Sequence, residues 1–377
     1  MSASGLPSGG PDVTCRFFLT GALARSDVLS HLLGDTEQDL RPFSLAGYAS
    51  GAGAFTVIPG LVPALDATTD GQILTCPVEH AKRLRFLAQS FKLAPSDCAV
   101  EGEETTIFLV ASVENPTLVK AWELTQLPML LHAIEEIMSY YGRHDVSEVA
   151  ARMPMILARA HSRVAALQTA PSAIRTALSS ENVEVGAERA THEGYFLTRS
   201  YRLRHPTFDG GQSEDVVREV FVATDAAIVL PYDPVRDRVL LVEQFRMGPF
   251  GRADPLPWVL EPVAGRVDPG EAPETTARRE CVEEAGLDLH TLKHVSSHYC
   301  SPGCSTEVFH CYVGLCDLPD MAQGQGGLET EHEDIRTHVL SFEDALNLTR
   351  TGEANIGPLV LLLLWLERER PRLRSIG

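Results

Sequence analysis

The sequence has no long hydrophobic run, and its first residues do not have the pattern expected of a secretory leader. Its longest apolar run, Leu359 to Leu366, is too short to span a bilayer, which needs roughly 20 residues. Residues 1–11 are small and polar and lack both a basic start and an apolar centre, which argues against a signal peptide. We therefore expect a cytoplasmic protein without membrane contact, and a buried terminal helix over 359–366.

Basic residues are also scarce. The chain of 377 residues has 32 Lys and Arg against 51 Asp and Glu, for a net charge of −19. Nucleic-acid binding depends on a basic footprint, so we expect no nucleic-acid partner. An anionic substrate would need local arginines and metal ions to overcome the field of the protein itself.

The eight cysteines include no CxxC pair. Cys300, Cys304, Cys311 and Cys316 cluster, but their spacings of three, six and four intervening residues do not match common zinc modules. Reduced core and loop thiols of a cytoplasmic protein are the favoured interpretation, and a zinc site is the alternative.

Three regions differ in pattern, in agreement with the domain number expected for this length. Residues 14–113 mix short strands with a helix that follows a turn at Thr20-Gly21 and ends near Gly34, and with a second helix over about 79–89, which is typical of an α+β unit or small barrel. Residues 114–180 carry apolar side chains at helical spacing, which predicts a helical connector or dimerisation element. Residues 181–377 alternate strands and helices, which indicates an α/β domain.

The chemistry-bearing motif is a glycine-rich loop followed by a helix. Pro273 is suited to a first helical turn and Gly286 to a C-terminal cap, with about three turns of helix between them. Glu280 and Glu284 are four residues apart and share a face, and Glu283 lies beside them. Such close carboxylates repel one another unless a cation is present, and Mg²⁺ prefers carboxylate and phosphate oxygens. An exposed acidic helix face is the alternative interpretation.

The full pattern resembles the Nudix box. From Gly265 it reads glycine, five residues, Glu271, seven residues, Arg-Glu, an apolar position, any residue, Glu-Glu, any residue, glycine and an apolar residue. Cys281 occupies the apolar position, which is usually aliphatic, and buried cysteine behaves as a small hydrophobe. The resemblance extends over about 183–366 to the bacterial ADP-ribose pyrophosphatases, with Glu243-Gln-Phe-Arg246 before the box. Pro302, fifteen residues after the box, is similar to the proline of that branch.

The resemblance implies a Nudix α/β/α sandwich with a mixed sheet, and hydrolysis of ADP-ribose to AMP and ribose 5-phosphate. It implies Mg²⁺ as cofactor, with Mn²⁺ as an alternative ion, bridging the diphosphate and positioning a water for attack. The implied metal ligands are the Ala264 carbonyl, Glu280, Glu284 and Glu333, with Glu283 as a further ligand or supporting group. The implied base is Glu331, with Glu329 as its rival.

The implied substrate contacts are Arg218, Glu219, Arg246 and Tyr195, the last by stacking on adenine. Gly265, Glu271, Arg279, Gly286 and Pro302 are structural in this comparison, Arg279 orienting the carboxylates and Glu271 holding the loop to the helix. Strands before the core exchange between subunits in the family, which implies a homodimer in which Tyr195 and Arg218 serve a composite site. Trp258 is interpreted as a core or interface residue, and Tyr195 has ordinary strand packing as its alternative.

The first hundred residues resemble the γ-glutamylcyclotransferase-like fold, an α+β barrel, through Phe17 to Leu23. Thr20 replaces the tyrosine of that family, and no acid occupies Leu87 to Ser90, where its catalytic glutamate is expected. The resemblance therefore implies a degenerate binding or structural module. Its pairing with a Nudix domain is similar to proteins associated with tellurite resistance.

Two alternatives to ADP-ribose hydrolysis stay open. The substrate could be another nucleoside diphosphate sugar: Pro302 and the loop that carries Glu331 favour ADP-ribose in the resemblance, but neither identifies the sugar directly. The domain could also be a silent Nudix fold that senses ADP-ribose. The complete set of box carboxylates, Glu280, Glu283 and Glu284, argues against the sensor, since a binder does not need all three.

Overall fold

The computed structural model describes residues 14–34, 38–51, 55, 57–110, 124–167, 173–176, 178–319, 324–326 and 334–375. The chain divides into two compact units, Met1–Pro171 and Ser172–Gly377. Within the described ranges, no helix is both long enough and apolar enough to cross a bilayer. Each unit is described by itself.

The first unit is built on a five-stranded sheet of order β2-β3-β1-β5-β4. The long strand β3 pairs antiparallel with β1 near its end, whereas Leu61 near its start pairs with Leu109 of β5. The strand β3 therefore pairs with both β1 and β5, and the sheet folds back on itself. Two of the strands are longer than the short strands expected from the sequence: the bounds are β1 (Thr14–Leu19), β2 (Asp39–Gly51), β3 (Gly60–Pro77), β4 (Leu93–Val100) and β5 (Glu103–Val110).

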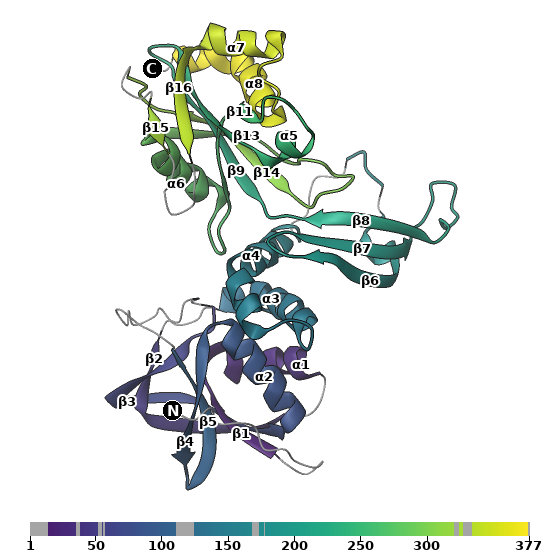
Figure 1. Ribbon diagram of the computed structural model, residues 1–377, viewed down its shortest axis with the longest axis vertical. Coiled ribbons are helices and arrows are strands. Elements are labelled where there is room, and N and C mark those ends of the chain that lie inside the picture. Colours follow the sequence, from purple (N-terminus) through teal and green to yellow (C-terminus); the bar gives the residue numbers. More distant parts are fainter. Residues whose placement is uncertain are drawn as a thin grey trace. The chain divides into compact units, whose positions relative to one another are not determined.

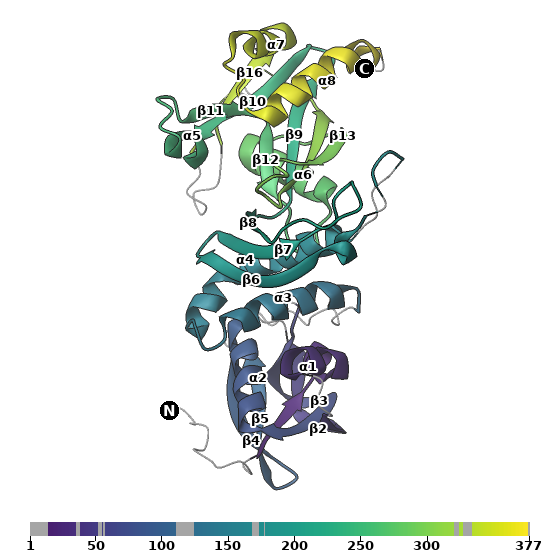
Figure 2. The same ribbon diagram turned by 90° about the vertical axis from the view of Figure 1, so that its right-hand side faces the viewer.

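The α-helices described in this unit gather at one side of the sheet (Figure 2). Because strand side chains alternate, Phe17 faces the helices while Phe18 faces a second apolar cluster with Ile73 and Ile107. The helices are α1 (Ser26–Leu33), α2 (Val78–Ser90), α3 (Leu127–Tyr140) and α4 (Val146–Ala165), with short 3-10 turns at Gly21–Ala24 and Leu124–Gln126.

The helices α3 and α4 lie in the segment 114–180, for which we expected a connector. Their apolar stripes, represented by Ile134 and Ile156, join Phe17 and the α2 residue Leu84 in one buried cluster. An amphipathic helix must cover its apolar face, and these two helices cover theirs within the first unit. The two helices are therefore part of the core of the first unit, and the division between units falls after Pro171.

The second unit contains an eight-stranded mixed sheet of main order β13-β14-β9-β10-β16-β15. Strands β9 and β14 run parallel, the other pairings are antiparallel, β11 pairs with β10, and β12 pairs with β9. The bounds are β9 (Ala226–Asp233), β10 (Arg238–Phe245), β11 (Trp258–Glu261), β12 (Val263–Arg266), β13 (Thr291–Tyr299), β14 (Val308–Leu315), β15 (Gln325–Gly326) and β16 (Ile335–Ser341).

Helices cover both faces of that sheet, as expected for an α/β/α sandwich (Figure 1). Val229 of β9 packs with Ala277 and Cys281 of α6 (Pro273–Ala285). Its neighbour Leu230 packs on the opposite face, against α7 (Phe342–Thr351) and α8 (Gly357–Arg374). The predicted terminal helix over 359–366 is confirmed within α8. A short helix, α5 (Met247–Gly251), links β10 to β11.

A separate three-stranded antiparallel sheet opens the second unit. It consists of β6 (Glu184–Glu193), β7 (Leu197–Arg204) and β8 (Val216–Val222), after a 3-10 turn at Ser180–Asn182. The Phe221 N–H donates to the Cys304 carbonyl at 2.8 Å, and the Thr306 N–H donates to the Phe221 carbonyl at 3.1 Å. The end of β8 is thus bound to the loop that carries Pro302.

Candidate active site

The box loop leads from β12 into α6, and the helix has the bounds expected from the sequence. Pro273 lies in the first turn, and Gly286 caps the end with φ of 64° in the left-handed region. Glycine takes that conformation without the cost that a Cβ would add, and such a residue commonly ends a helix. The helix therefore presents Glu280, Glu283 and Glu284 over a short, defined length.

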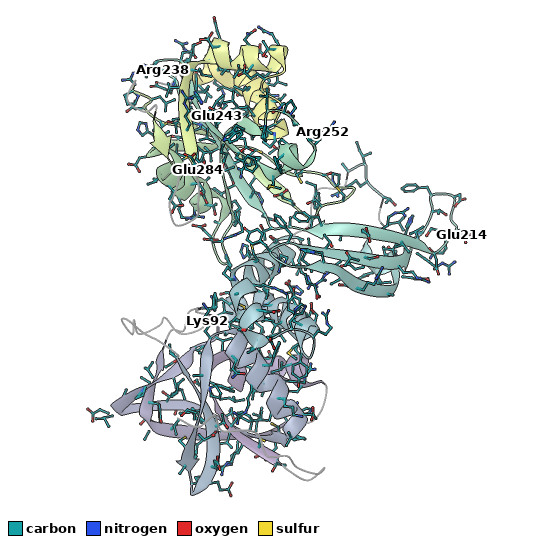
Figure 3. All side chains as sticks on the ribbon, in the orientation of Figure 1. Lys92, Glu214, Arg238, Glu243, Arg252 and Glu284 are labelled. Carbon is teal, nitrogen blue, oxygen red and sulfur yellow. The ribbon has the colours of Figure 1, made fainter. Side chains whose placement is uncertain are left out.

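The three carboxylates differ in burial. Glu284 is 2% exposed, the side chain of Glu280 is 13% exposed, and that of Glu283 is 31% exposed. Figure 3 labels Glu284 on α6. Charged groups are rarely buried without compensation. The burial of Glu284 and Glu280 therefore indicates a polar site on the sheet side of α6, within an otherwise apolar layer.

Gly265 is required by the close approach of Glu280. A Cβ at position 265 would lie 1.9 Å from Glu280 Oε1 and 2.0 Å from Glu280 Cδ. Gly265 does not have a positive φ, so glycine is needed at this position only because a side chain would not fit. The carboxylate of Glu280 therefore rests directly on the backbone of β12, next to Ala264.

Arg279 links the loop to the carboxylates. Its Nη1 donates to Glu280 Oε1 at 2.7 Å and to Glu283 Oε2 at 2.9 Å. Its Nη2 donates to Glu271 Oε2 at 3.3 Å and to the Arg266 carbonyl at 3.4 Å. Burial would lower the pKa of this guanidinium, but the surrounding carboxylates outweigh burial and raise it. Arg279 is thus a permanent cation among three acids.

Glu271 fixes the loop against the start of the helix. The Thr276 hydroxyl donates to Glu271 Oε2 at 2.6 Å, beside the bond from Arg279. Burial alone would raise the pKa of the Glu271 carboxyl, but these two donors hold it below its ordinary value. Asp268 adds a looser ion pair to Arg279 at 3.8 Å. Neither Asp268 nor Thr276 was predicted from the sequence as part of the site.

Ala264 lies in β12 opposite Ile228, beside Gly265. Glu331, Glu333 and the rival base Glu329 lie outside the described residues. The chain enters their loop through Leu318, whose N–H donates to Asp233 Oδ2 at 3.0 Å.

Asp233 is a structural residue that sequence reasoning missed. It is fully buried at the end of β9 and accepts N–H bonds from Val235 and Arg236, both at 2.9 Å, besides that from Leu318. Burial would raise the pKa of its carboxyl, but these donors lower it. An Asp before Pro in a turn is a visible signal, whereas its bond to a residue 85 positions later is not.

Arg246 stands between β10 and α5. Its Nε donates to Glu261 Oε2 at 2.7 Å, and its side chain stays 41% exposed. Glu261 was also missed, because the pair joins the residue after β10 to the end of β11 and has no spacing signature. The exposed fraction of Arg246 leaves the guanidinium accessible to an anionic ligand.

The remaining predicted contact residues lie on the three-stranded sheet and its turns. Tyr195 is 66% exposed and packs edge-on against Phe196, with ring centroids 5.0 Å apart. Arg218 and Glu219 are exposed on β8, and Arg218 donates to the carbonyl of its neighbour Val217. Pro302 is exposed in the loop that binds the end of β8. Tyr195 and Arg218 thus contact residues adjacent to them in the sequence.

Comparison with known proteins matches the family model "NUDIX domain" to residues 222–361. ADP-ribose pyrophosphatase of Escherichia coli (strain K12) is 39% identical over 205 residues, which cover 54% of this chain and 97% of that protein. ADP-ribose pyrophosphatase of Haemophilus influenzae is 38% identical over 199 residues, covering 52% and 91%. GDP-mannose pyrophosphatase of Salmonella arizonae is 32% identical over 191 residues, covering 50% and 96%.

A solved structure described as an ADP compounds hydrolase matches 51% of this chain and 98% of its own, with 20% identity and a TM-score of 0.39. The sequence relatives carry the assignment, because they are matched over nearly their whole length at well above 30% identity. The residues matched by the family model, 222–361, include the whole box from Gly265 to Leu287. The chain belongs to the Nudix family, and its second unit is a Nudix pyrophosphohydrolase.

Proposed function

We propose that the second unit hydrolyses the pyrophosphate bond of ADP-ribose to AMP and ribose 5-phosphate. The observation that carries the proposal is the arrangement of Glu280, Glu283 and Glu284 on one helix, with Glu280 seated on Gly265. Relatives named ADP-ribose pyrophosphatase, matched over 97% of their length, support this choice of substrate. The division of burial among the three acids supports a site rather than a solvated helix face.

The donor atoms suit Mg²⁺, with Mn²⁺ as the alternative ion. Hard divalent cations take carboxylate and carbonyl oxygens, which is the chemistry of Glu280, Glu284 and the neighbouring Ala264 carbonyl. Glu333 would add a ligand, and Glu283 a further ligand or a supporting group. When bound, the ion would neutralise diphosphate charge and lower the pKa of a coordinated water.

The residues of the chain then have distinct tasks. Arg279 holds Glu280 and Glu283 in place through its two bonds, so it is a positioning residue. Glu331 accepts the proton of the attacking water. Arg246 and Arg218 bind the diphosphate or the terminal ribose, because a planar guanidinium matches phosphate oxygens. Glu219 contacts the substrate as well, and Tyr195 stacks on adenine.

The proposed enzyme is a homodimer. Supporting this, β6 buries no residue, and Val185, Tyr195 and Val217 are more than half exposed on or beside the three-stranded sheet. A sheet with so little burial is marginal by itself and is stabilised when another surface covers it. A second copy of the chain would cover these residues and receive Tyr195 and Arg218 into its site.

The substrate test measures product formation from ADP-ribose with Mg²⁺ by chromatography, on the full chain. AMP and ribose 5-phosphate are expected, with loss of both on chelation and a fall of about a hundredfold or more in Glu284→Gln and Glu331→Gln. Glu353→Gln is a matched control, because Glu353 is exposed and remote in sequence from the box. Unchanged turnover in Glu284→Gln would refute the assignment.

A second candidate substrate is a GDP-linked sugar, favoured by the relatives named GDP-mannose pyrophosphatase at 32% identity. The ratio of kcat/KM for ADP-ribose to that for GDP-mannose decides between them, and a ratio below one overturns the ADP-ribose proposal. Binding of ADP-ribose without turnover by the intact protein would instead identify a sensor.

The dimer is tested by complementation. Glu284→Gln and Arg218→Ala variants, each inactive alone, are mixed under conditions that allow subunit exchange. If Arg218 serves the site of the partner, the mixture regains up to about a quarter of wild-type activity, because random exchange restores one intact site in half of the dimers. No recovery, despite exchange seen with differently tagged chains, would refute a composite site.

We also propose that the first unit is a γ-glutamylcyclotransferase-like module without cyclotransferase activity. In support, Phe18, Ile73 and Ile107 form an apolar cluster on one face of its sheet. The buried Ser90 hydroxyl donates to the Phe86 carbonyl, and no acid lies at the end of α2. Release of 5-oxoproline from γ-glutamyl dipeptides by the full chain would refute the inactive assignment.

A further inference from the structure

Two cysteines of the first unit face each other across paired strands. Cys15 of β1 is the direct register partner of Cys76 of β3 in an antiparallel pair. Direct partners have Cα atoms about 4.5 or 5.5 Å apart, depending on the type of pair. Both values fall within the range of about 4.4–6.8 Å that a disulfide spans. The backbone therefore already has the separation that a cross-link needs.

The two side chains also point to the same side. The next pair on that face is Phe17 opposite Leu74, and Cys15, Cys76, Phe17 and Leu74 all belong to the cluster under the helices. Cys76 is 3% exposed, whereas Cys15 is only partly buried near the start of β1. Cys15 is thus the more exposed residue of the pair.

Other cysteines in described strands lack such a partner. Cys98 is opposite Thr105, and Cys311 is opposite Ser296. The Cys311 pair is also a direct cross-strand pair, but it lies at a register shift and has a hydroxyl in place of one thiol. Cys311 and Ser296 therefore serve as an internal control, because a cysteine opposite a serine cannot close a disulfide with that partner.

We propose that Cys15 and Cys76 form a reversible oxidation site that closes a disulfide by exchange with a small-molecule disulfide. The Cys15 thiolate attacks one sulfur of the reagent, whose S–S bond breaks and releases one thiolate. The Cys76 thiolate then attacks the Cys15 sulfur and displaces the second thiolate. Two protein thiols are oxidised, the reagent is reduced to two thiols, and the two protons pass to those products.

The surroundings make this exchange slow at neutral pH. Burial raises the pKa of the Cys76 thiol to about 12. Burial also raises the pKa of Cys15, against the opposing effect of the Arg85 guanidinium and with a contribution from Asp97. Only the thiolate reacts, so the rate should rise by up to about tenfold per pH unit across the alkaline range.

The test incubates the reduced, full-length protein with excess oxidised glutathione, alkylates the remaining thiols and maps peptides by mass spectrometry. The expected product is a Cys15–Cys76 peptide pair in protein about 2 Da lighter, reversed by dithiothreitol. A stable glutathione adduct on wild-type Cys15, or a cross-link that joins either cysteine elsewhere, would overturn the proposal. So would complete alkylation of both thiols after prolonged incubation at pH 9.

Variants test the order of the steps. Cys76→Ser should trap the glutathione adduct on Cys15, and Cys15→Ser should leave Cys76 unmodified. Cys98→Ser is the matched control and should form the disulfide at the wild-type rate. An adduct on Cys76 in Cys15→Ser would contradict the assigned order, and peptide mapping of the wild type decides the cross-link itself if either variant fails to fold.

Discussion

Replacing Gly265 with alanine should damage the chemistry of the site while leaving the fold largely intact. The new Cβ would lie 1.9 Å from Glu280 Oε1, whereas ordinary van der Waals contact begins near 3.4 Å. The carboxylate must therefore retreat by about 1.5 Å, a distance that a flexible side chain covers by rotation rather than by moving the backbone. The bond from Arg279 Nη1 to Glu280 Oε1, now 2.7 Å, would break in the same movement.

A misplacement of about 1 Å at a catalytic group costs on the order of a hundredfold in rate. We therefore expect kcat/KM for the pyrophosphate substrate to fall about a hundredfold, equivalent to about 2.7 kcal/mol of transition-state stabilisation. The free energy of unfolding should fall by no more than about 1 kcal/mol, because the lost pair is partly exposed. The Mg²⁺ concentration for half-maximal activity should rise.

The assay combines steady-state kinetics with urea unfolding for Gly265→Ala, Glu280→Gln and the double variant. If the alanine acts through Glu280 alone, the double variant is no slower than Glu280→Gln, so the two effects are not additive. Gly357→Ala is the control, since a Cβ there meets nothing within 4 Å. Activity of Gly265→Ala within threefold of wild type, with the protein folded, would refute the reasoning, and so would additive losses.

Three further predictions concern charge. Arg279→Ala should lower kcat at least tenfold and raise the Mg²⁺ requirement, because three repelling carboxylates lose their cation; Arg279→Lys should recover only part, since one ammonium cannot replace the contacts of both Nη1 and Nη2, and equal kinetics for the two variants would contradict this. Asp233→Asn should destabilise the second unit by about 3 kcal/mol, measured by urea unfolding. Because the folded pKa of Asp233 is depressed, its stabilisation is present above its unfolded pKa of about 4 and is lost as pH falls through the folded value; the variant should therefore lose less stability than wild type as pH falls below about 4, and parallel acid curves would argue against it. Glu136→Ala should cost the first unit about 3–5 kcal/mol by leaving the Arg159 charge buried, whereas replacing both residues with methionine should restore most of that loss; a double variant as unstable as the single one would show that the ion pair is not the cause.

The residues of the box could be located from the sequence because their physics is local. Pro273 and Gly286 mark the ends of α6 through backbone preferences that act within one turn. The spacing of Glu280 and Glu284 places both on one face of any helix. The opposite orientation of neighbouring side chains in β9 likewise follows from strand geometry. The alternation of strands and helices indicated an α/β domain, whereas the sandwich with both faces covered was implied by the Nudix resemblance.

The tertiary structure decided what depends on contacts between distant residues. The apolar stripes of α3 and α4 can be recognised in the sequence, but their choice of the first unit as partner cannot, since an amphipathic helix specifies only that some surface must cover it. The bond from Leu318 to Asp233, the pairing of Arg246 with Glu261, and the register that sets Cys15 opposite Cys76 likewise have no local signature. Gly265 illustrates both cases. Its position could be recognised in the motif, whereas the need for glycine there, which is the Glu280 carboxylate resting on its backbone, exists only in the folded protein.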